Sequence, residues 1–336
     1  MQHRNIPIFI PHMGCPNQCV FCNQHSISGR QDFDPQSVRG EVERALATIP
    51  EDTETEIAFF GGSFTGIDRD LMIRLLDIAD SFVKDGRVRS IRLSTRPDYI
   101  SNQILEILSQ YPVRHIELGL QSMQDSVLSA SHRGHTAEQA RQACRSVLNA
   151  GFSLVGQMMI GLPGSTLEDE CQTAREICDL GASAVRIYPT VVFYDTPLCQ
   201  LAQEGEYTPL STLEAVERSA KVLRIFRERD IPCIRIGLCA SEDLISSEHV
   251  YAGPNHPALG ELVWNAYYYD ELKQVLQEKH LLGKSVCLTI PKAEYSKIVG
   301  QKRSNVERIQ LQTGTVIQKI IADNKRIGIL AEEYRA

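Results

Sequence analysis

The chain has 336 residues, of which 43% are hydrophobic and 23% are charged, and its formal net charge is −7 at pH 7. This composition is typical of an ordinary globular protein, and the length is sufficient for two domains with a large core. Residues 1–5 are too polar for a signal peptide and no apolar run is long enough to span a membrane, so we expect a cytoplasmic protein without membrane contacts.

Segments with strand and helix periodicity alternate from residue 6 to residue 188. Strand-then-helix units in a row predict an α/β fold with a parallel sheet and right-handed crossovers. Curled, this sheet forms a partial (β/α)6 TIM-like barrel, whose active site lies at the C-terminal ends of the strands. The expected strands cover 6–10, 56–60, 88–93, 113–120, 152–160 and 184–188, and the expected helices cover 38–49, 71–83, 104–108, 137–148 and 167–180.

Three cysteines, Cys15, Cys19 and Cys22, form a C-x3-C-x2-C array directly after the first expected strand. Three thiolates this close in sequence can hold three corners of a metal site and leave the fourth position open. Structural zinc is the alternative, and it needs a fourth ligand such as His12 or His25. The other seven cysteines are scattered without metal-type spacing, which indicates buried free thiols.

Polar or glycine-rich loops follow the later strands, at the edge of the sheet where the cysteines are expected. The second strand ends in Gly61-Gly-Ser-Phe-Thr65, where two glycines permit close backbone approach and where hydroxyls and carbonyls can hold an ammonium group. A plain glycine-rich turn is the alternative. The loops after later strands contain Ser94-Thr-Arg96, Gln121-Ser122 and Gly161-Leu-Pro163.

Together, the cysteine array and these loops resemble the radical SAM superfamily. The resemblance implies a 4Fe–4S cluster on the three cysteines, with S-adenosylmethionine (SAM) chelating the fourth iron. It further implies reductive cleavage of SAM to methionine and a 5′-deoxyadenosyl radical, with a one-electron reductant such as flavodoxin or ferredoxin as a partner. The residues expected to bind SAM are Phe21, Gly61, Gly62, Ser63, Thr65, Ser94, Gln121, Ser122, Arg133 and Met159.

The same resemblance implies which part of SAM several of these residues contact. The loop from Gly61 to Thr65 would hold the amino group, and Gln121 with Ser122 would lie near the ribose or methionine part. Arg133 would bind the carboxylate, a role that suits a bidentate guanidinium, although a surface salt bridge is the alternative. Met158, Met159 and Ile160 would pack against adenine or else belong to the ordinary strand core.

The order of four segments narrows the resemblance to the radical SAM domain of the Elongator catalytic subunit and its bacterial relatives. It extends over residues 5–240, although the gap between Cys15 and Cys19 is shorter here. We expect no acetyltransferase domain, since too few residues follow to form one. The four segments are Gly119-Leu-Gln-Ser122, Arg133-Gly-His-Thr136, Met158 to Thr166 and Arg186-Ile-Tyr-Pro-Thr190.

Residues 281–336 differ in charge from the rest of the chain. They contain ten Lys/Arg and five Asp/Glu, which gives a net charge of +5. Because the whole chain has a net charge of −7, the preceding 280 residues have a net charge of −12. Their expected order, strand 286–291, two helices, and strands 315–321 and 326–330, resembles a KH domain, in which a G-x-x-G loop clamps single-stranded nucleotides. Here that loop is Gly300, Gln301, Lys302 and Arg303, so an arginine replaces the second glycine and supplies positive charge for phosphates.

Three functional hypotheses follow. The first is a radical SAM enzyme that modifies tRNA or rRNA, with a barrel (1–240), a helical connector (241–280) and a KH-like RNA-binding domain (281–336). The second is a radical SAM enzyme for a small molecule, because oxygen-independent coproporphyrinogen oxidase shares the cysteine spacing and His256-Pro-Ala-Leu-Gly260 is similar to small-molecule members. The third is a non-enzymatic KH-type RNA-binding protein with a structural metal.

Overall fold

The computed structural model describes residues 3–15, 19–23, 27, 33–50, 52–238 and 248–334. The chain divides into two compact units, one made of residues 1–215 and 225–257 and the other of residues 216–224 and 258–336. Residues 216–224 belong to helix α9 (Thr212–Glu228), so this helix contributes to both units. Among the described residues, no helix combines the length and the apolar character needed to cross a membrane.

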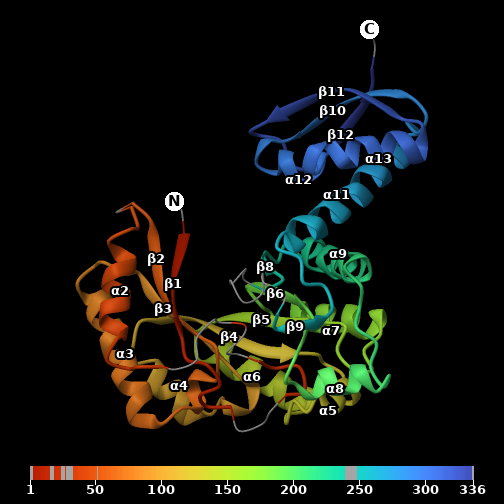
Figure 1. The fold of residues 1–336 in the computed structure, drawn as a ribbon. Coiled ribbons are helices and arrows are strands. Elements are labelled where there is room, and N and C mark those ends of the chain that lie inside the picture. The colour runs from red at the N-terminus through yellow and green to blue at the C-terminus, as the bar shows by residue number, and fades with distance from the viewer. Residues whose placement is uncertain are drawn as a thin grey trace. The chain divides into compact units, whose positions relative to one another are not determined.

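In the described part of the first unit, seven strands form a curved, entirely parallel sheet in the order β1-β2-β3-β4-β5-β6-β8 (Figure 1). This confirms the predicted α/β fold with a partial barrel, and the six predicted strands are all present. The strands are β1 (His3–Phe9), β2 (Glu54–Phe60), β3 (Ser90–Thr95), β4 (Val113–Gln121), β5 (Ser153–Ile160), β6 (Ala184–Pro189) and β8 (Cys233–Ile236).

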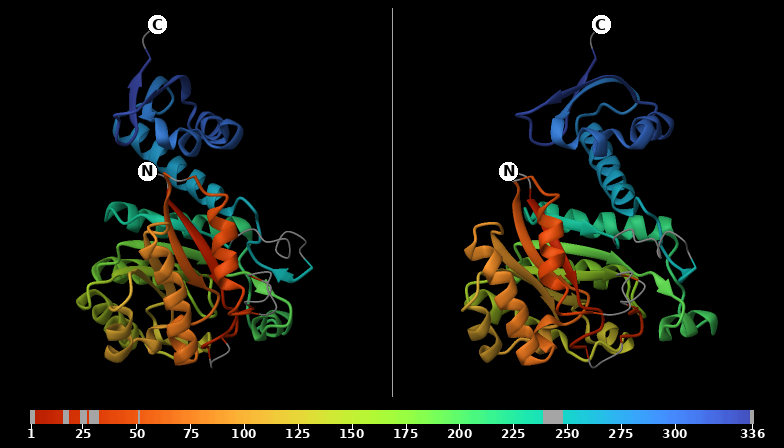
Figure 2. Two further views of the ribbon diagram at one scale, coloured as in Figure 1. Left: turned by 90° about the vertical axis from the view of Figure 1, so that its left-hand side faces the viewer. Right: turned by 60° about the vertical axis from the view of Figure 1, so that its left-hand side comes forward.

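Helices between the strands pack against the outer face of this sheet (Figures 1 and 2). Three of them begin at capping boxes, in which the Thr136, Thr166 and Ser211 hydroxyls accept from the third helical residue, and these caps fix where each loop ends. A short antiparallel pair, β7 (Val192–Phe193) and β9 (Val250–Ala252), completes the unit. The helices are α2 (Val38–Leu46), α3 (Arg69–Lys84), α4 (Asn102–Leu108), α5 (Asp125–Ala130), α6 (Ala137–Asn149), α7 (Leu167–Asp179), α8 (Pro197–Gln203) and α9.

The two faces of the sheet differ in chemistry, because successive side chains of a strand point to opposite faces. Apolar residues such as Ile57 and Leu93 are fully buried on the helix-covered face. On the other face, Arg92 binds the carboxylates of Glu56 at 2.8 Å and Glu117 at 2.9 Å, and Arg186 binds Glu117 at 2.7 Å. The barrel interior therefore contains a buried ion-pair network that joins strands β2, β3, β4 and β6.

The second unit consists of residues 216–224 of α9, helix α11 (Leu259–Glu278) and a β-α-α-β-β segment that follows α11. In its described part, three strands pair in the order β11-β10-β12, with β10 parallel to β11 and antiparallel to β12. The predicted order of elements is confirmed, although the last strand begins at Leu330, later than expected. The elements are β10 (Ser285–Pro291), α12 (Tyr295–Val299), α13 (Ser304–Thr313), β11 (Val316–Asp323) and β12 (Leu330–Glu333).

Asn305 anchors the helical layer of the second unit. This residue is 4% exposed, and its amide nitrogen donates to the carbonyl of Asn265 in α11 at 2.9 Å and to that of Ile298 in α12 at 3.1 Å. Helix α13 is thus tied to both α11 and α12. Because Asn305 is the second residue of α13, this anchor also fixes the loop from Gly300 to Arg303 that precedes the helix.

Candidate active site

The cysteine loop follows β1 and is held to the rest of the first unit through Val20. The Val20 amide donates to the carbonyl of Ser131 at 3.2 Å, and its carbonyl accepts from the Leu198 amide at 2.9 Å. Cys15, Cys19 and Cys22 are described, whereas residues 16–18 and the candidate zinc ligand His25 lie outside the described residues. These bonds place the cysteines at the C-terminal edge of the sheet, as predicted.

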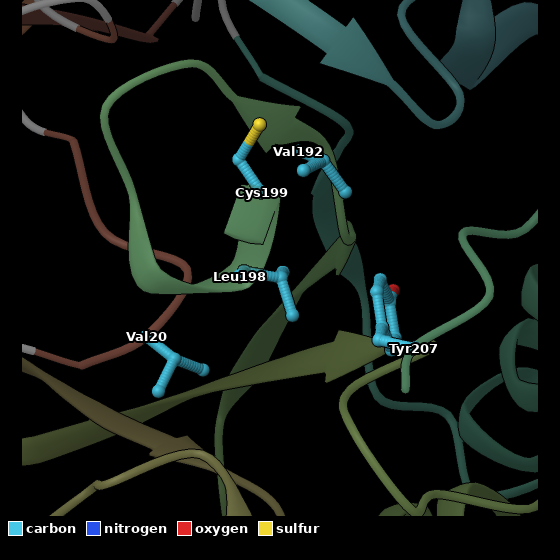
Figure 3. Packing of buried hydrophobic residues seen from close by; sticks show 5 residues of the cluster. All are labelled: Val20, Val192, Leu198, Cys199 and Tyr207. Atoms are coloured by element: carbon cyan, nitrogen blue, oxygen red, sulfur yellow. The ribbon is translucent and has the colours of Figure 1, made fainter. Parts of the chain in front are cut away.

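Apolar packing strengthens this attachment. Figure 3 shows the Val20 side chain beside Leu198 of α8, in a buried cluster that also contains Val192, Cys199 and Tyr207. Phe21, a predicted cofactor contact, is partly buried against the same cluster. Its described contacts therefore support the position of the loop, and its contact with SAM stays a prediction.

The loop from Gly61 to Thr65 packs backbone to backbone against the cysteine loop. A Cβ atom on Gly62 would lie 2.4 Å from the Met13 carbonyl oxygen and 2.7 Å from that of Ile10, which only glycine avoids. The Ser63 amide also donates to the Met13 carbonyl at 3.0 Å. The described role of Gly62 is therefore to let the two loops meet, a role that differs from the ligand approach expected from the sequence.

The two hydroxyls of this loop have partners within the protein. Ser63 Oγ lies 3.0 Å and Thr65 Oγ1 lies 2.6 Å from Thr95 Oγ1 at the end of β3, and the Arg96 amide donates to Ser63 Oγ at 3.1 Å. Ser94 is half-buried and lines a narrow crevice beside Gly62 and Ser63. These bonds connect the β2 and β3 loops into one surface.

Two buried arginines approach Cys19. Arg133 Nη1 donates to Cys19 Sγ at 3.2 Å and Nη2 donates to the Gly119 carbonyl at 2.5 Å, while Arg96 Nη1 lies 3.9 Å from the same sulfur. Burial raises the pKa of the neighbouring Cys15 thiol, although the positive charges of Arg96 and Arg133 act to lower that pKa. Cys19 therefore lies in a buried environment beside two positive charges, whereas Cys15 and Cys22 are half-buried. Arg96 belongs to the loop Ser94-Thr-Arg96 noted in the sequence, although it is not among the residues expected to bind SAM.

Gln121 ends β4 at a bulge, in a left-handed backbone conformation with φ of 66°. Its Oε1 atom is buried and finds no hydrogen-bond partner among the described residues, and the same holds for Arg133 Nε. Ser122 is buried, and its hydroxyl accepts from the Gln124 amide at 3.2 Å. A strained residue that carries an unsatisfied buried acceptor indicates a ligand position.

The methionine strand β5 shows ordinary alternation. Met158 and Ile160 are fully buried, whereas Met159 is half-buried on the other face and pairs in register with Tyr188 of β6. The resemblance places Met158, Met159 and Ile160 against adenine; the alternation assigns Met158 and Ile160 to the strand core and leaves Met159 as the candidate contact.

The described residues contain no group of three His, Cys, Asp or Glu side chains in an arrangement that could hold a metal ion. In a cluster each cysteine ligates a different iron atom, so its thiolates need not converge on one point. The donor set has the right chemistry for such a cluster, because it offers three thiols, and the Cys19 sulfur lies 3.2 Å from Arg133 Nη1 and 3.9 Å from Arg96 Nη1. The unsatisfied Gln121 Oε1 and Arg133 Nε atoms also fit a polar ligand placed beside the thiols.

The family model of the radical SAM superfamily matches residues 9–177, which is half of the chain. The chain belongs to the radical SAM superfamily. A second model, the radical SAM C-terminal domain, matches residues 182–268. Radical SAM proteins use a 4Fe–4S cluster and SAM, which confirms the cofactors expected from the sequence.

Relatives of this radical SAM chain include two larger proteins. Elongator complex protein 3 of Saccharomyces cerevisiae is 27% identical over 232 residues, which cover 60% of this chain and 42% of the relative. The tRNA uridine(34) acetyltransferase of Methanocaldococcus jannaschii is 26% identical over 244 residues, 60% of this chain and 45% of the relative. This chain thus spans somewhat less than half the length of either protein.

A solved structure shares the fold. The archaeal Elp3 of Methanocaldococcus infernus, with an N-terminal deletion, superposes with a TM-score of 0.61 at 21% identity and covers 88% of this chain and 67% of that chain. The predicted relationship to the radical SAM part of the Elongator catalytic subunit is confirmed.

Proposed function

We propose that this radical SAM protein is an enzyme that modifies RNA, most specifically tRNA, and that Cys15, Cys19 and Cys22 hold its cluster. The observation that carries the proposal is the meeting of the cysteine loop, the Gly61 loop and the Gln121 bulge at one edge of the sheet, beside two buried arginines. When bound, the cluster and SAM supply a 5′-deoxyadenosyl radical. The protein orients its ligands at this edge and keeps water from them.

Each loop has a separate task in binding SAM under this proposal. Backbone carbonyls near Gly61 and Gly62 receive the amino group, because the hydroxyls of Ser63 and Thr65 are bonded to Thr95. The unsatisfied Oε1 of Gln121 accepts from a ribose hydroxyl or the amino group. Met159, on the inner face of β5, packs against the adenine ring.

The second unit supports RNA as the substrate class. Lys302 and Arg303 are exposed and have positive φ values of 51° and 66°. Arg303, which replaces the second glycine of the G-x-x-G loop, therefore has the left-handed backbone that a glycine would favour. Gly300 has φ of 79°, and a Cβ there would lie 2.4 Å from Ser304 Oγ, so glycine is required. A fixed, positively charged turn of this kind fits the phosphates of a single-stranded RNA segment.

The choice of tRNA comes from the relatives. One of them is named for its action on uridine 34 of tRNA, and the match to it covers 60% of this chain. The acetyl transfer in that name is not part of this proposal, because the match covers less than half of the relative. The proposed activity is therefore a radical modification of a nucleotide in a single-stranded tRNA region.

The test is anaerobic reconstitution of the full chain with iron and sulfide, followed by reduction, addition of SAM and quantification of 5′-deoxyadenosine. We expect product formation that total tRNA stimulates, and loss of product in Cys19→Ala but not in Cys178→Ala, which removes a cysteine of helix α7. Product formation that is indifferent to tRNA and rRNA would favour a small-molecule substrate. Normal cleavage by Cys19→Ala would refute the cluster assignment.

RNA binding is tested separately by charge reversal at Lys302 and Arg303. The double change Lys302→Glu and Arg303→Glu should weaken tRNA binding and flatten its dependence on salt. The matched control is Lys319→Glu with Lys325→Glu, which alters the same charge on exposed residues of β11 and the following turn. Equal losses in both double variants would show that net charge, and not this loop, determines binding.

A further inference from the structure

Arg133 differs from its neighbour Arg96 in how its buried charge is balanced. Both side chains are buried, at 6% and 3% exposure. Arg96 forms a two-bond ion pair with Asp98, at 2.9 and 2.8 Å, and donates to the Arg133 carbonyl at 2.6 Å. Arg133 has no carboxylate within ion-pair distance among the described residues, and its Nη1 donates to the sulfur of Cys19 at 3.2 Å.

The position of the Arg133 guanidinium is fixed by its surroundings. Nη2 donates to the Gly119 carbonyl at 2.5 Å, and the missing Cβ of Gly119 leaves the space that this approach needs, since a Cβ would lie 3.1 Å from Nη2. Two of the three guanidinium nitrogens are thus directed toward Cys19 and Gly119. This arrangement holds an N–H group against one sulfur of the cysteine array.

We propose that Arg133 is a positioning residue for the cluster, which donates a hydrogen bond to the Cys19 sulfur and raises the reduction potential. The inference rests on the proposed ligation of the cluster by Cys19. Reduction adds one electron from an external donor and, without SAM, breaks no bond. Hydrogen bonds to cluster sulfurs and nearby positive charge stabilise the more negative, reduced state.

The test is a potentiometric titration of the reconstituted full chain, without SAM or RNA, followed by the EPR signal of the reduced cluster. Arg133→Gln should lower the midpoint potential by at least about 59 mV, which corresponds to a tenfold loss in the one-electron reduction equilibrium. Arg133→Lys, which keeps the charge but not the guanidinium, should show a smaller decrease. The control Arg145→Gln removes an exposed arginine of α6 and should leave the potential unchanged.

Gly119→Ala is a second variant that keeps Arg133 and its charge, but its Cβ would lie 3.1 Å from Nη2, so the guanidinium must shift by a few tenths of an ångström. Gly119→Ala should also lower the midpoint potential of the cluster. If Arg133→Gln does not retain iron, the potential of Gly119→Ala tests the inference in its place. Wild-type potentials in both Gly119→Ala and Arg133→Lys would refute the inference. A normal potential together with lost SAM affinity in Arg133→Gln would assign this residue to the SAM carboxylate instead. Failure of the wild type to bind any cluster would refute the proposed function itself.

Discussion

Glu56 provides a quantitative prediction about stability, because its carboxylate lies in the barrel interior and is 2% exposed. It accepts hydrogen bonds from Ser90 at 2.6 Å and from Arg92 at 2.8 Å. Burial alone raises the pKa of this carboxyl, but Ser90 and Arg92 outweigh burial and lower the pKa from 4.5 to about 2. A carboxylate with a lower pKa in the folded state stabilises the fold above pH 4.5, and this contribution is lost as the pH falls toward 2.

The magnitude follows from the two pKa values. Their difference corresponds to roughly 3 kcal/mol of unfolding free energy at neutral pH, and about 1 kcal/mol of this should disappear between pH 5.5 and pH 3.5. The substitution Glu56→Gln keeps the shape of the side chain but removes its charge. We therefore expect the unfolding free energy of the variant to be lower than that of the wild type by about 3 kcal/mol at pH 7. At pH 3.5 this difference should be smaller by about 1 kcal/mol.

Urea unfolding followed by circular dichroism at 222 nm, at several pH values, measures this difference. The control is Glu106→Gln, which changes an exposed carboxyl of helix α4 and should not alter the pH dependence. If Glu56→Gln and the wild type lose stability in parallel between pH 5.5 and pH 3.5, the ionised form of Glu56 does not stabilise the fold, and the argument from its buried ion pair is wrong.

Three further predictions concern the loops and the second unit. Gly62→Ala places a Cβ 2.4 Å from the Met13 carbonyl and should lower the iron bound after reconstitution, with a loss of unfolding free energy of about 2 kcal/mol; normal iron content would show that the two loops can separate without harm. In Arg303→Gly the new residue suits the left-handed backbone, so the protein should still bind RNA. The slope of log K against log[salt] should fall in magnitude by about 0.7, the value for one phosphate contact on a single strand. An unchanged slope would show that Arg303 does not contact the RNA. Asn305→Ala should destabilise the second unit by about 1–3 kcal/mol, as reported by the fluorescence of Trp264, the single tryptophan of the chain, which lies in α11; an unchanged transition would contradict the anchoring role.

The sequence predicts the strands that have long apolar or alternating patterns, and it misses the short strands β7, β8 and β9, which lack such a pattern. Strand β8 has four residues, Cys233–Ile236, and only part of it pairs with β6. Such a short segment has too little periodicity to be distinguished from a loop. Helix α5, with six residues, is missed for the same reason.

The candidate site is predictable in its residues but less so in their contacts. Loop position follows from strand order, so the cysteines, Gly61, Gln121 and Arg133 are expected at one edge. The sequence predicts Gly62 as a ligand contact, but the structure requires glycine there because a Cβ would collide with the backbone of Met13. This contact joins two loops that lie far apart in sequence. The ion-pair network of the barrel interior also cannot be predicted from the sequence, because a charged residue inside a strand does not reveal which strand supplies its partner.

Charge balance explains why one buried arginine stands apart from the others. The described part of the chain buries four arginines, Arg92, Arg96, Arg133 and Arg186. Arg92 and Arg186 are neutralised by glutamates of the barrel interior, and Arg96 is neutralised by Asp98. Burying an unpaired charge costs several kcal/mol, so a fold that pairs three of its buried arginines with carboxylates needs another anion for the fourth. The sulfur of Cys19 lies where that anion is required, and a cysteine ligated to iron is a thiolate. The same argument explains why a carboxylate in place of Cys19 would satisfy Arg133 without restoring the cluster: Cys19→Asp should fold as the wild type does, yet lose the iron that the wild type retains.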